Sequence, residues 1–313
     1  MSDFVIIAEP ASGMHKEFRE KWNIDDYVPI KITFPDGKNY STDPDWSLID
    51  PDKYYSSMKD GKAMYKTGVC PPEEISEIYE RHLKEGKDVL VVALSSGMSA
   101  SCSMFKKAAM DSMEKYPGRK IRVVDSLRFS TVITMMNVIA SEMRAAGKSL
   151  DETADWLEAN RLRFRQMGPM DDLNFLAKAG RITGMKAFFG TLVGVNSLGD
   201  FNNQGISQVL GTVKGKKKAI DATVKYVAQT ITDPENQVVF IGHTHRAEEA
   251  AQLKELIEAE IHPKEVIVTR VDMSCGANIG PGMVGVYYMG EPGSEGLEKE
   301  QAVMNKIIEG QKR

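Results

Sequence analysis

KDVLVVALSSGMSASCSM, residues 87–104, is the stretch of sequence that decides the fold. It begins with a short apolar run at 88–94 that predicts a strand buried on both faces. Small hydroxyl residues follow at 95–101, and a helical pattern comes next. A strand that leads into a helix through such residues directs backbone N–H groups and hydroxyls at one place, which attracts an anion or a carboxylate. The alternative, in which Ser99 or Ser101 only caps the helix, stays open at this point.

Length and composition bound the class of protein. The chain has 313 residues, of which 42% are hydrophobic and 27% charged, as in an ordinary globular protein of about two domains. A net charge of −4 gives no general reason to bind nucleic acid. The N-terminus has no signal-peptide pattern, and no apolar window approaches the length of a membrane span. The 3 cysteines are not closely spaced. We therefore expect a cytoplasmic protein without a membrane span.

Strand and helix patterns alternate along much of the chain. Short buried strands are predicted at Phe4–Ala8 and Ile121–Asp125, on either side of the 88–94 run. A capping box formed by Ser149 and Glu152 opens a later helix. This alternation indicates an α/β fold with helix-covered, mainly parallel sheets.

The pattern breaks around residues 166–169, and we place a domain boundary there. Residues 1–167 and 168–313 are therefore predicted to form two α/β domains. Strands expected in the second domain are Val195–Leu198, Ile206–Val213, Gln237–His243, Glu265–Val271 and Met283–Met289, with helices at Lys216–Ile231 and Ala247–Ile261.

Several segments resemble, in order along the chain, the motifs of the DegV family, bacterial proteins that bind a fatty acid between two α/β domains. Leu94 to Ser101 resembles the family's serine loop, S-S-x-L-S-G-T, and Thr67 the threonine of its T-S-Q-P loop. Further similar segments are Val123-Val124-Asp125-Ser126 (V-I-D-S), Asp171 to Leu176 with Gly180-Arg181-Ile182 (D-x-L-x-x-L-x-x-G-G-R-I), and Gly280-Pro281-Gly282 (H-T-G-P-G). The resemblance covers nearly the whole chain and implies two α/β domains with a ligand cleft between them.

The resemblance also implies where a fatty acid would bind. Its carboxylate would be held by Thr67 and Ser99, with Ser96 beside them in the serine loop. Asn278 takes the place of the family's histidine, and its amide can hydrogen-bond a carboxylate without carrying charge. The acyl tail would lie in an apolar tunnel of the second domain, whose candidate wall residues are Met185, Phe188, Phe189, Leu192 and Val193.

A carrier of this family performs no chemistry and needs no cofactor, and some members present the carboxylate to an ATP-dependent fatty acid kinase. The chain departs from the family pattern at Ala100 and Ala179, where the family has glycine, and at Asn278. Lys214-Gly215 stands where the family has Arg-Thr. These departures concern kinase docking more than lipid binding, because burial of an acyl chain requires no particular residue.

The residues themselves also allow two other functions, a serine hydrolase and a zinc site. Gly97 to Ser101 is one residue short of the G-x-S-x-G nucleophile elbow, so Ser99 could be the nucleophile of a serine hydrolase acting on an acyl ester, with His243, His245 or His262 as base. His243 and His245 with Cys275 could also bind zinc, but no C-x-x-C accompanies them. We expect no metal site, and we expect Cys70, Cys102 and Cys275 to be small core residues.

Overall fold

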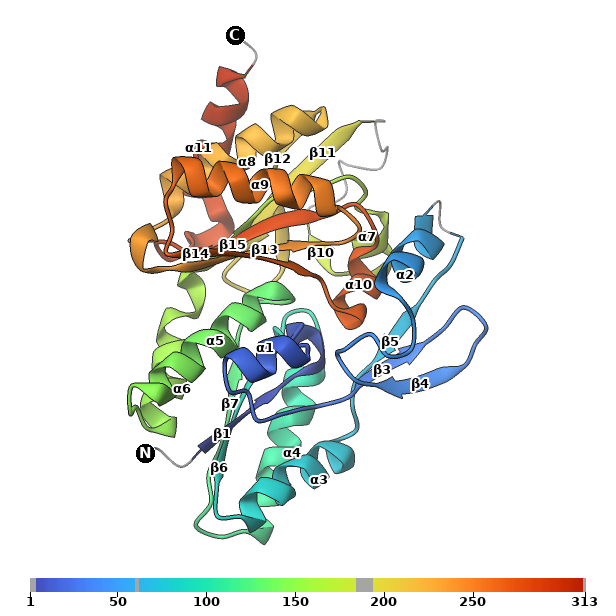
Figure 1. Ribbon diagram of the computed structural model, residues 1–313, viewed down its shortest axis with the longest axis vertical. Helices are drawn as coiled ribbons and strands as arrows, with labels where there is room; N and C mark the ends of the chain where they lie inside the picture. Colours follow the sequence, from blue (N-terminus) through green and yellow to red (C-terminus); the bar gives the residue numbers. More distant parts are fainter. Residues whose placement is uncertain (1–3, 60–61, 184–193, 312–313) are drawn as a thin grey trace. The chain divides into compact units, whose positions relative to one another are not determined.

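Strand β6, Asp88–Ala93, is an inner strand of a parallel sheet in the computed structural model of the protein (Figure 1). It pairs with β1, Phe4–Ala8, and with β7, Ile121–Asp125, and β2, Asp26–Tyr27, completes the order β2-β1-β6-β7. Successive side chains of a strand point to opposite faces of the sheet, and residues 89–93 are all buried. The prediction of a strand buried on both faces is confirmed.

Helices cover both faces of this sheet. The side chains of Val89 and Val91 pack against α3, Pro72–Lys84, and α4, Ser101–Lys115, in one apolar cluster. Helices α5, Thr131–Ala145, and α6, Leu150–Asn160, also contact β6. The predicted capping box of Ser149 and Glu152 opens α6.

The structure describes residues 4–59, 62–183 and 194–311, and the chain forms two units. The first contains residues 1–50, 64–161 and 272–275, and the second contains 51–63, 162–271 and 276–313. The predicted boundary after residue 167 differs from this division, because β8, Phe164–Met167, pairs with a strand of the second unit. The exchange of residues 51–63 and 272–275 between the units was not predicted from the sequence.

The first unit has a second, antiparallel sheet in the order β4-β3-β5, formed by β3, Ile30–Thr33, β4, Asn39–Thr42, and β5, Lys66–Gly68. The family resemblance placed Thr67 in a loop, whereas the structure places it on β5. Pro29 has no N–H to donate to a sheet, and the chain at this point passes from β2 of the parallel sheet to β3. The remaining elements of the first half are η1, Pro10–Ser12, α1, Lys16–Lys21, and α2, Pro51–Met58.

The second unit contains two mixed sheets, in the orders β14-β13-β15-β8 and β10-β12-β11-β9. Their strands, besides β8, are β9 Pro169–Met170, β10 Ile182–Thr183, β11 Val195–Phe201, β12 Ser207–Lys214, β13 Val238–His243, β14 Glu265–Arg270 and β15 Val284–Met289. The helices are α7 Asn174–Ala179, α8 Lys216–Thr230, α9 Ala247–Glu260 and α11 Glu298–Gly310. Helix α10, Met273–Ile279, begins in the first unit and ends in the second. The α/β fold class is confirmed, although antiparallel pairs are common outside the first sheet.

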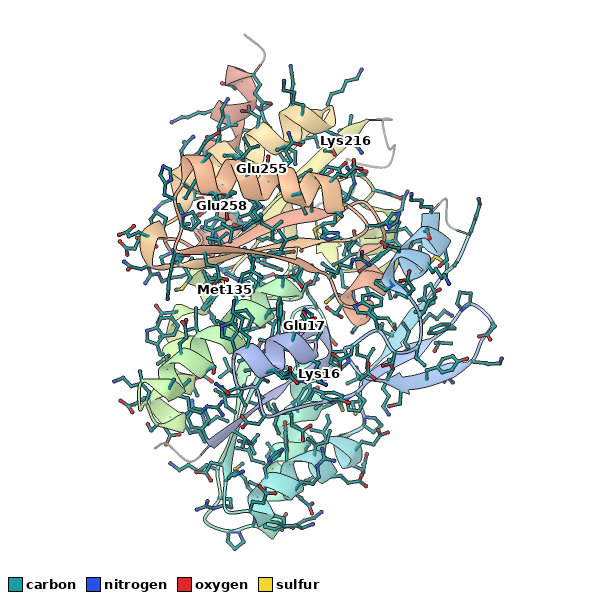
Figure 2. All side chains as sticks on the ribbon, viewed as in Figure 1. Lys16, Glu17, Met135, Lys216, Glu255 and Glu258 are labelled. Carbon is teal, nitrogen blue, oxygen red and sulfur yellow. The ribbon has the colours of Figure 1, made fainter. Side chains whose placement is uncertain are left out.

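Helix α9 shows how the sequence pattern becomes packing. Ala250, Leu253 and Ile257 follow the helical period and are buried in the core of the second unit. Glu255 and Glu258 lie on its exposed side (Figure 2). Within the described ranges, no helix is both long and apolar enough to span a membrane.

A buried ion pair joins the two sheets of the second unit. Arg165 of β8 donates from Nε to Asp200 of β11 at 2.7 Å, and their side chains are 2% and 0% exposed. The same guanidinium contacts Glu300 of α11 at 3.3 Å and the hydroxyl of Tyr226 of α8 at 3.2 Å. Asp200 also accepts the backbone N–H of Gln166 at 3.1 Å. This network satisfies charges that would otherwise be costly to bury.

Asp200→Asn should lower the free energy of unfolding by about 3 kcal/mol, because it leaves a buried guanidinium without its nearest countercharge. Glu258→Gln is the matched control, since it breaks an exposed pair with Lys254 and should cost less than about 1 kcal/mol. Urea unfolding of both variants measures the difference. Equal losses in the two variants would show that the buried network does not stabilise the second unit.

Candidate functional site

The serine-rich turn lies at the carboxyl end of β6 and leads into α4. Ser96 is exposed and Ser99 is half-buried. The N-cap of α4 is Ala100, which makes no side-chain cap. Ser99 Oγ instead accepts the N–H of Ser101 at 3.1 Å and is 3.0 Å from the Ser101 hydroxyl. Ser99 therefore supports the start of the helix while its hydroxyl stays partly accessible.

The expectation of free backbone N–H groups at this turn is corrected by the structure. The carboxylate of Asp125, at the end of β7, accepts the N–H of Ser96 at 3.1 Å. Ser95 Oγ accepts the N–H of Gly97 at 3.1 Å. The Ser95 carbonyl accepts the backbone N–H groups of Met98 and Ser99. Buried amides of a tight turn must find such partners. An anion at this turn would thus be bound mainly through the hydroxyls of Ser96 and Ser99.

The geometry of a serine hydrolase is not found at Ser99. Within the described ranges, the hydrogen bonds of its hydroxyl go to Ser101, and no imidazole contacts it. A serine nucleophile requires a base within hydrogen-bond reach. His243, His245 and His262 all belong to the second unit, whereas Ser99 belongs to the first.

Thr67 lies on β5, opposite Ile32 of β3 in the antiparallel sheet, and it is half-buried. Its two neighbours in the chain are also paired with β3, Lys66 with Thr33 and Gly68 with Lys31, so the backbone around Thr67 is held by the sheet and not by a loop. It shares the first unit with Ser96 and Ser99.

Glu9 and Asp272 of the first unit have buried carboxyl groups, and no sequence pattern indicates a role for either. Glu9 follows β1, is 3% exposed, and its Oε1 accepts the N–H of Ala11 at 2.9 Å. Asp272 precedes α10, is 2% exposed, and accepts the N–H of Cys275 at 2.8 Å. Burial, and then the charge of Asp272, raise the pKa of Glu9 well above its usual range. Burial raises the pKa of Asp272 to about 6.

The cysteines behave as buried thiols. All three are buried and free, and burial raises the pKa of Cys70 and of Cys102 to about 11. Burial also raises the pKa of Cys275, whose thiol donates to the carbonyl of Ala11 at 3.6 Å. Such thiols are protonated at neutral pH and are poor nucleophiles and metal ligands. Within the described ranges, no cluster of His, Cys, Asp and Glu has the arrangement of a metal site.

Asn278 lies near the end of α10 and is half-buried. One glycine on each side of it, Gly276 and Gly280, is closely packed within the second unit. A Cβ on Gly276 would lie 2.4 Å from the hydroxyl oxygen of Tyr55, and one on Gly280 would lie 2.2 Å from the Phe175 ring. Tyr55 also donates to the carbonyl of Val271 at 2.8 Å. These contacts fix the segment that carries Asn278.

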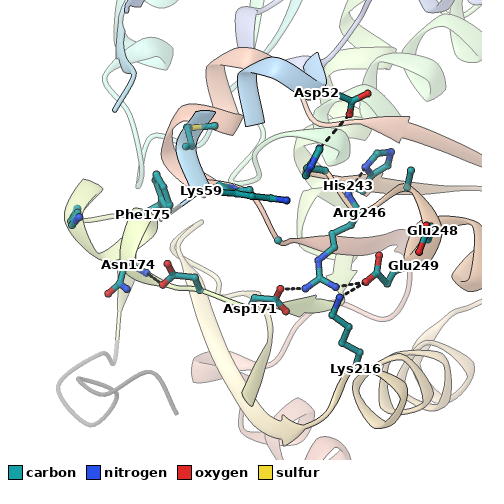
Figure 3. Close-up of a pocket in the computed structure, with 17 residues that line it drawn as sticks. Asp52, Lys59, Asp171, Asn174, Phe175, Lys216, His243, Arg246, Glu248 and Glu249 are labelled. Atoms are coloured by element: carbon teal, nitrogen blue, oxygen red, sulfur yellow. Dashed lines mark hydrogen bonds and ion pairs between the residues drawn. The ribbon is translucent and has the colours of Figure 1, made fainter. Parts of the chain in front are cut away.

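A polar pocket of about 800 Å³ lies in the second unit (Figure 3). It is lined by Asp52 of α2 and by Lys59, which directly follows that helix, by residues around α7, by Lys216, by His243, and by residues 245–249 at the start of α9. Pro281 and Gly282 of the closing glycine loop also line it, but none of the predicted carboxylate-binding residues does. The predicted tail residues Met185, Phe188, Phe189, Leu192 and Val193 lie outside the described residues.

Glu9 and Arg246 carry only weak signals in the sequence. Glu9 follows a buried strand at a position where a charged residue needs a specific partner. Arg246, only 8% exposed, ends the His243-Thr244-His245-Arg246 run, of which only the histidines were considered. Each has one local partner, Ala11 for Glu9 and Glu249 for Arg246. Asp272 and Asp171, which complete their surroundings, come from distant parts of the chain, so no local pattern identifies them.

Comparison with known proteins gives one consistent family. The family model for the uncharacterised DegV proteins matches residues 3–291. A DegV domain-containing protein of Clostridium perfringens is 26% identical over 93% of this chain and 99% of its own. A fatty acid-binding DegV family protein from Thermus thermophilus superposes with a TM-score of 0.81 at 24% identity, covering 92% of this chain and 99% of its own. The fatty acid-binding DegV of Bacillus subtilis gives 0.77 at 22% identity, covering 93% and 100%. At these identities, the two structures establish the fold.

Asp272→Asn tests the buried carboxyl groups through pH. The pKa of Asp272 is about 6 in the folded protein and about 4 in an unfolded chain. The stability contributed by its proton is therefore complete below about pH 4 and is lost as the pH rises through about 6. From pH 4 to 7 this group should lower the free energy of unfolding by about 2–3 kcal/mol. Asp272→Asn should lack that decrease and be the more stable protein at pH 7.

Chemical unfolding at a series of pH values makes this measurement. Asp155→Asn, which removes an exposed carboxyl of the same unit, is the control and should keep the slope of the natural protein. An unchanged slope in Asp272→Asn would contradict the assignment of this pH dependence to Asp272.

Proposed function

Because the chain belongs to the DegV family, we propose that it binds a long-chain fatty acid and acts as a non-catalytic carrier. The match of the family over residues 3–291 is the observation that carries this proposal. Proteins of the same fold from Thermus thermophilus and Bacillus subtilis bind fatty acids. The serine-rich turn between β6 and α4 supports it, since it offers hydroxyls at the end of a parallel strand, where open α/β sheets bind ligands.

In this proposal the carboxylate is bound by Thr67, Ser96, Ser99 and Asn278. The half-buried positions of Thr67 and Ser99 suit hydroxyls that must remain accessible to a ligand. Asn278 would donate from its amide. All of these donors are neutral, so they orient the carboxylate without a formal countercharge.

The acyl tail would supply most of the affinity. Burial of each methylene contributes about 0.8 kcal/mol, so a long acyl chain gains on the order of 10 kcal/mol before entropic losses. A hydrogen bond to a charged group adds only about 1.5–3 kcal/mol. The tail would lie along the segment that contains Met185, Phe188, Phe189 and Leu192.

The carrier would deliver the carboxylate to a partner, and an ATP-dependent fatty acid kinase is the partner that the family resemblance suggests. This part of the proposal depends most on the residues that depart from the family pattern. They are Asn278, in place of histidine, and Lys214-Gly215, in place of Arg-Thr.

Protein purified from bacteria should carry a fatty acid that native mass spectrometry detects. Ser99→Ala and Thr67→Val should each weaken fatty acid binding by about 1–2 kcal/mol without unfolding the protein. Shortening the ligand by several methylenes should cost more than either substitution. The matched control is Ser103→Ala, which changes an exposed serine in the first turn of α4. This variant should bind the fatty acid as the natural protein does.

Calorimetry on delipidated protein gives these affinities. A protein that carries no lipid and takes up none when it is offered would refute the proposed function. Unchanged affinity in both Ser99→Ala and Thr67→Val would instead remove only these two residues from the site.

Asn278 separates binding from delivery. Because its amide does not titrate, affinity for a fatty acid should be nearly constant between about pH 6 and 8, whereas Asn278→His should bind more tightly at the acidic end of this range.

Lipid-loaded protein, offered with ATP to the fatty acid kinase of its own source organism, should form acyl phosphate slowly, and Asn278→His should form it faster. Rapid turnover by the natural protein would show that a histidine at this position is dispensable for delivery.

A further inference from the structure

The polar pocket of the second unit has a buried histidine at its wall. His243 is 5% exposed and ends β13. Its Nδ1 accepts the backbone N–H of Arg246 at 3.2 Å. A ring nitrogen that accepts a hydrogen bond carries no proton, so the neutral imidazole holds its proton on Nε2. Within the described ranges, Nε2 has no partner, and the ring lines the pocket (Figure 3).

Most of the acidic side chains around this pocket are already paired. Asp171 binds Arg246, and Glu249 is 2.5 Å from Arg246 and 2.8 Å from Lys216. Asp52 is 3.1 Å from Arg270.

The two remaining acids differ. Asp172 accepts the N–H of Asn174 at 2.8 Å, and Glu248 is exposed in the first turn of α9. Few acceptors in the pocket are therefore open to a ligand that brings donors.

Apart from Glu248, the open polar side chains of the pocket that carry the argument are donors. Lys59 and Lys178 line it, and neither side-chain amine has a hydrogen-bond or ion-pair partner in the part of the chain that the structure describes. Figure 3 shows the Lys59 side chain extending into the pocket toward His243 and Arg246. A cationic amine and an N–H that converge on one space are complementary to an oxygen acceptor with negative charge.

We propose that this pocket binds the oxyanion group of a small polar molecule, with Lys59 and the Nε2–H of His243 as its donors. A phosphate monoester fits best, because several donors surround the space and a phosphate offers three strong acceptor oxygens. A volume of about 800 Å³ accommodates a small organic molecule attached to that group. The pairing of Arg246 with Asp171 and Glu249 holds the start of α9 beside His243 and keeps those carboxylates from repelling the ligand.

This site is separate from the proposed lipid function in its residues. Thr67, Ser96, Ser99 and Asn278 do not line the pocket. Loss of one activity therefore need not affect the other, and each can be tested alone.

Titration of the full-length protein at pH 7 with inorganic phosphate tests the proposal. The long-range ¹H–¹⁵N spectrum of the histidine side chains should show His243 in its Nε2-protonated form, and phosphate should shift its signals. The signal is assigned by its loss in His243→Gln. Lys59→Gln should weaken phosphate binding about tenfold, as expected for loss of one charge-assisted hydrogen bond.

Lys306→Gln is the matched control, since it removes the same charge from an exposed position on α11 and should leave the affinity unchanged. A parallel titration with acetate separates the two oxyanion classes: a larger shift with phosphate supports a phosphate ligand, and a larger shift with acetate assigns a carboxylate ligand. The proposal is overturned if neither anion shifts His243, or if Lys59→Gln and Lys306→Gln bind phosphate equally.

Discussion

Burial of β6 on both faces is the constraint on which the first unit depends. A strand with apolar side chains on both sides needs a helix layer over each face, and parallel neighbours require crossovers that supply those helices. The carboxyl ends of β6 and β7 then lie at the same edge of the sheet. This brings Asp125 within hydrogen-bond reach of Ser96 and shapes the turn on which Ser99 lies. The position of the hydroxyls that we propose to bind the ligand is thus a direct consequence of how the core is built.

The second unit depends on a different kind of interaction. Its two sheets are joined by the buried Arg165–Asp200 pair, which also contacts α8 and α11 through Tyr226 and Glu300. Charges buried in this way define one arrangement of the surrounding elements, because any other arrangement leaves them unpaired. Arg246 has a comparable role nearer the surface, where it links Asp171 to the start of α9. Both arginines fix local geometry with a planar group that binds two partners at once.

Polar groups in this protein therefore act in two ways. Those with protein partners, such as Asp125 and Arg246, set the geometry of turns and helix starts. Those whose capacity remains open, such as the Ser96 hydroxyl and His243 Nε2, are available to ligands. The buried carboxyls of Glu9 and Asp272 belong to the first group, but their raised pKa values make their contribution depend on pH. A ligand would meet Ser99 and His243 in orientations that hydrogen bonds within the protein already set.

The sequence by itself determined the elements whose signals are local. The periodicity of β1, β6 and β7 and the capping box of α6 depend on neighbouring residues, so each could be predicted within a short window. The family resemblance supplied Thr67, Ser96, Ser99 and Asn278 as a hypothesis about the site. Tertiary structure alone decided that Lys66–Gly68 is a strand, that residues 51–63 join the second unit, and that Asp272 is buried with Glu9. It also decided that His243 faces a pocket with Lys59. The physical reason is that strand pairing, burial and ion pairing depend on residues far apart in the chain, and these meet only in the folded protein.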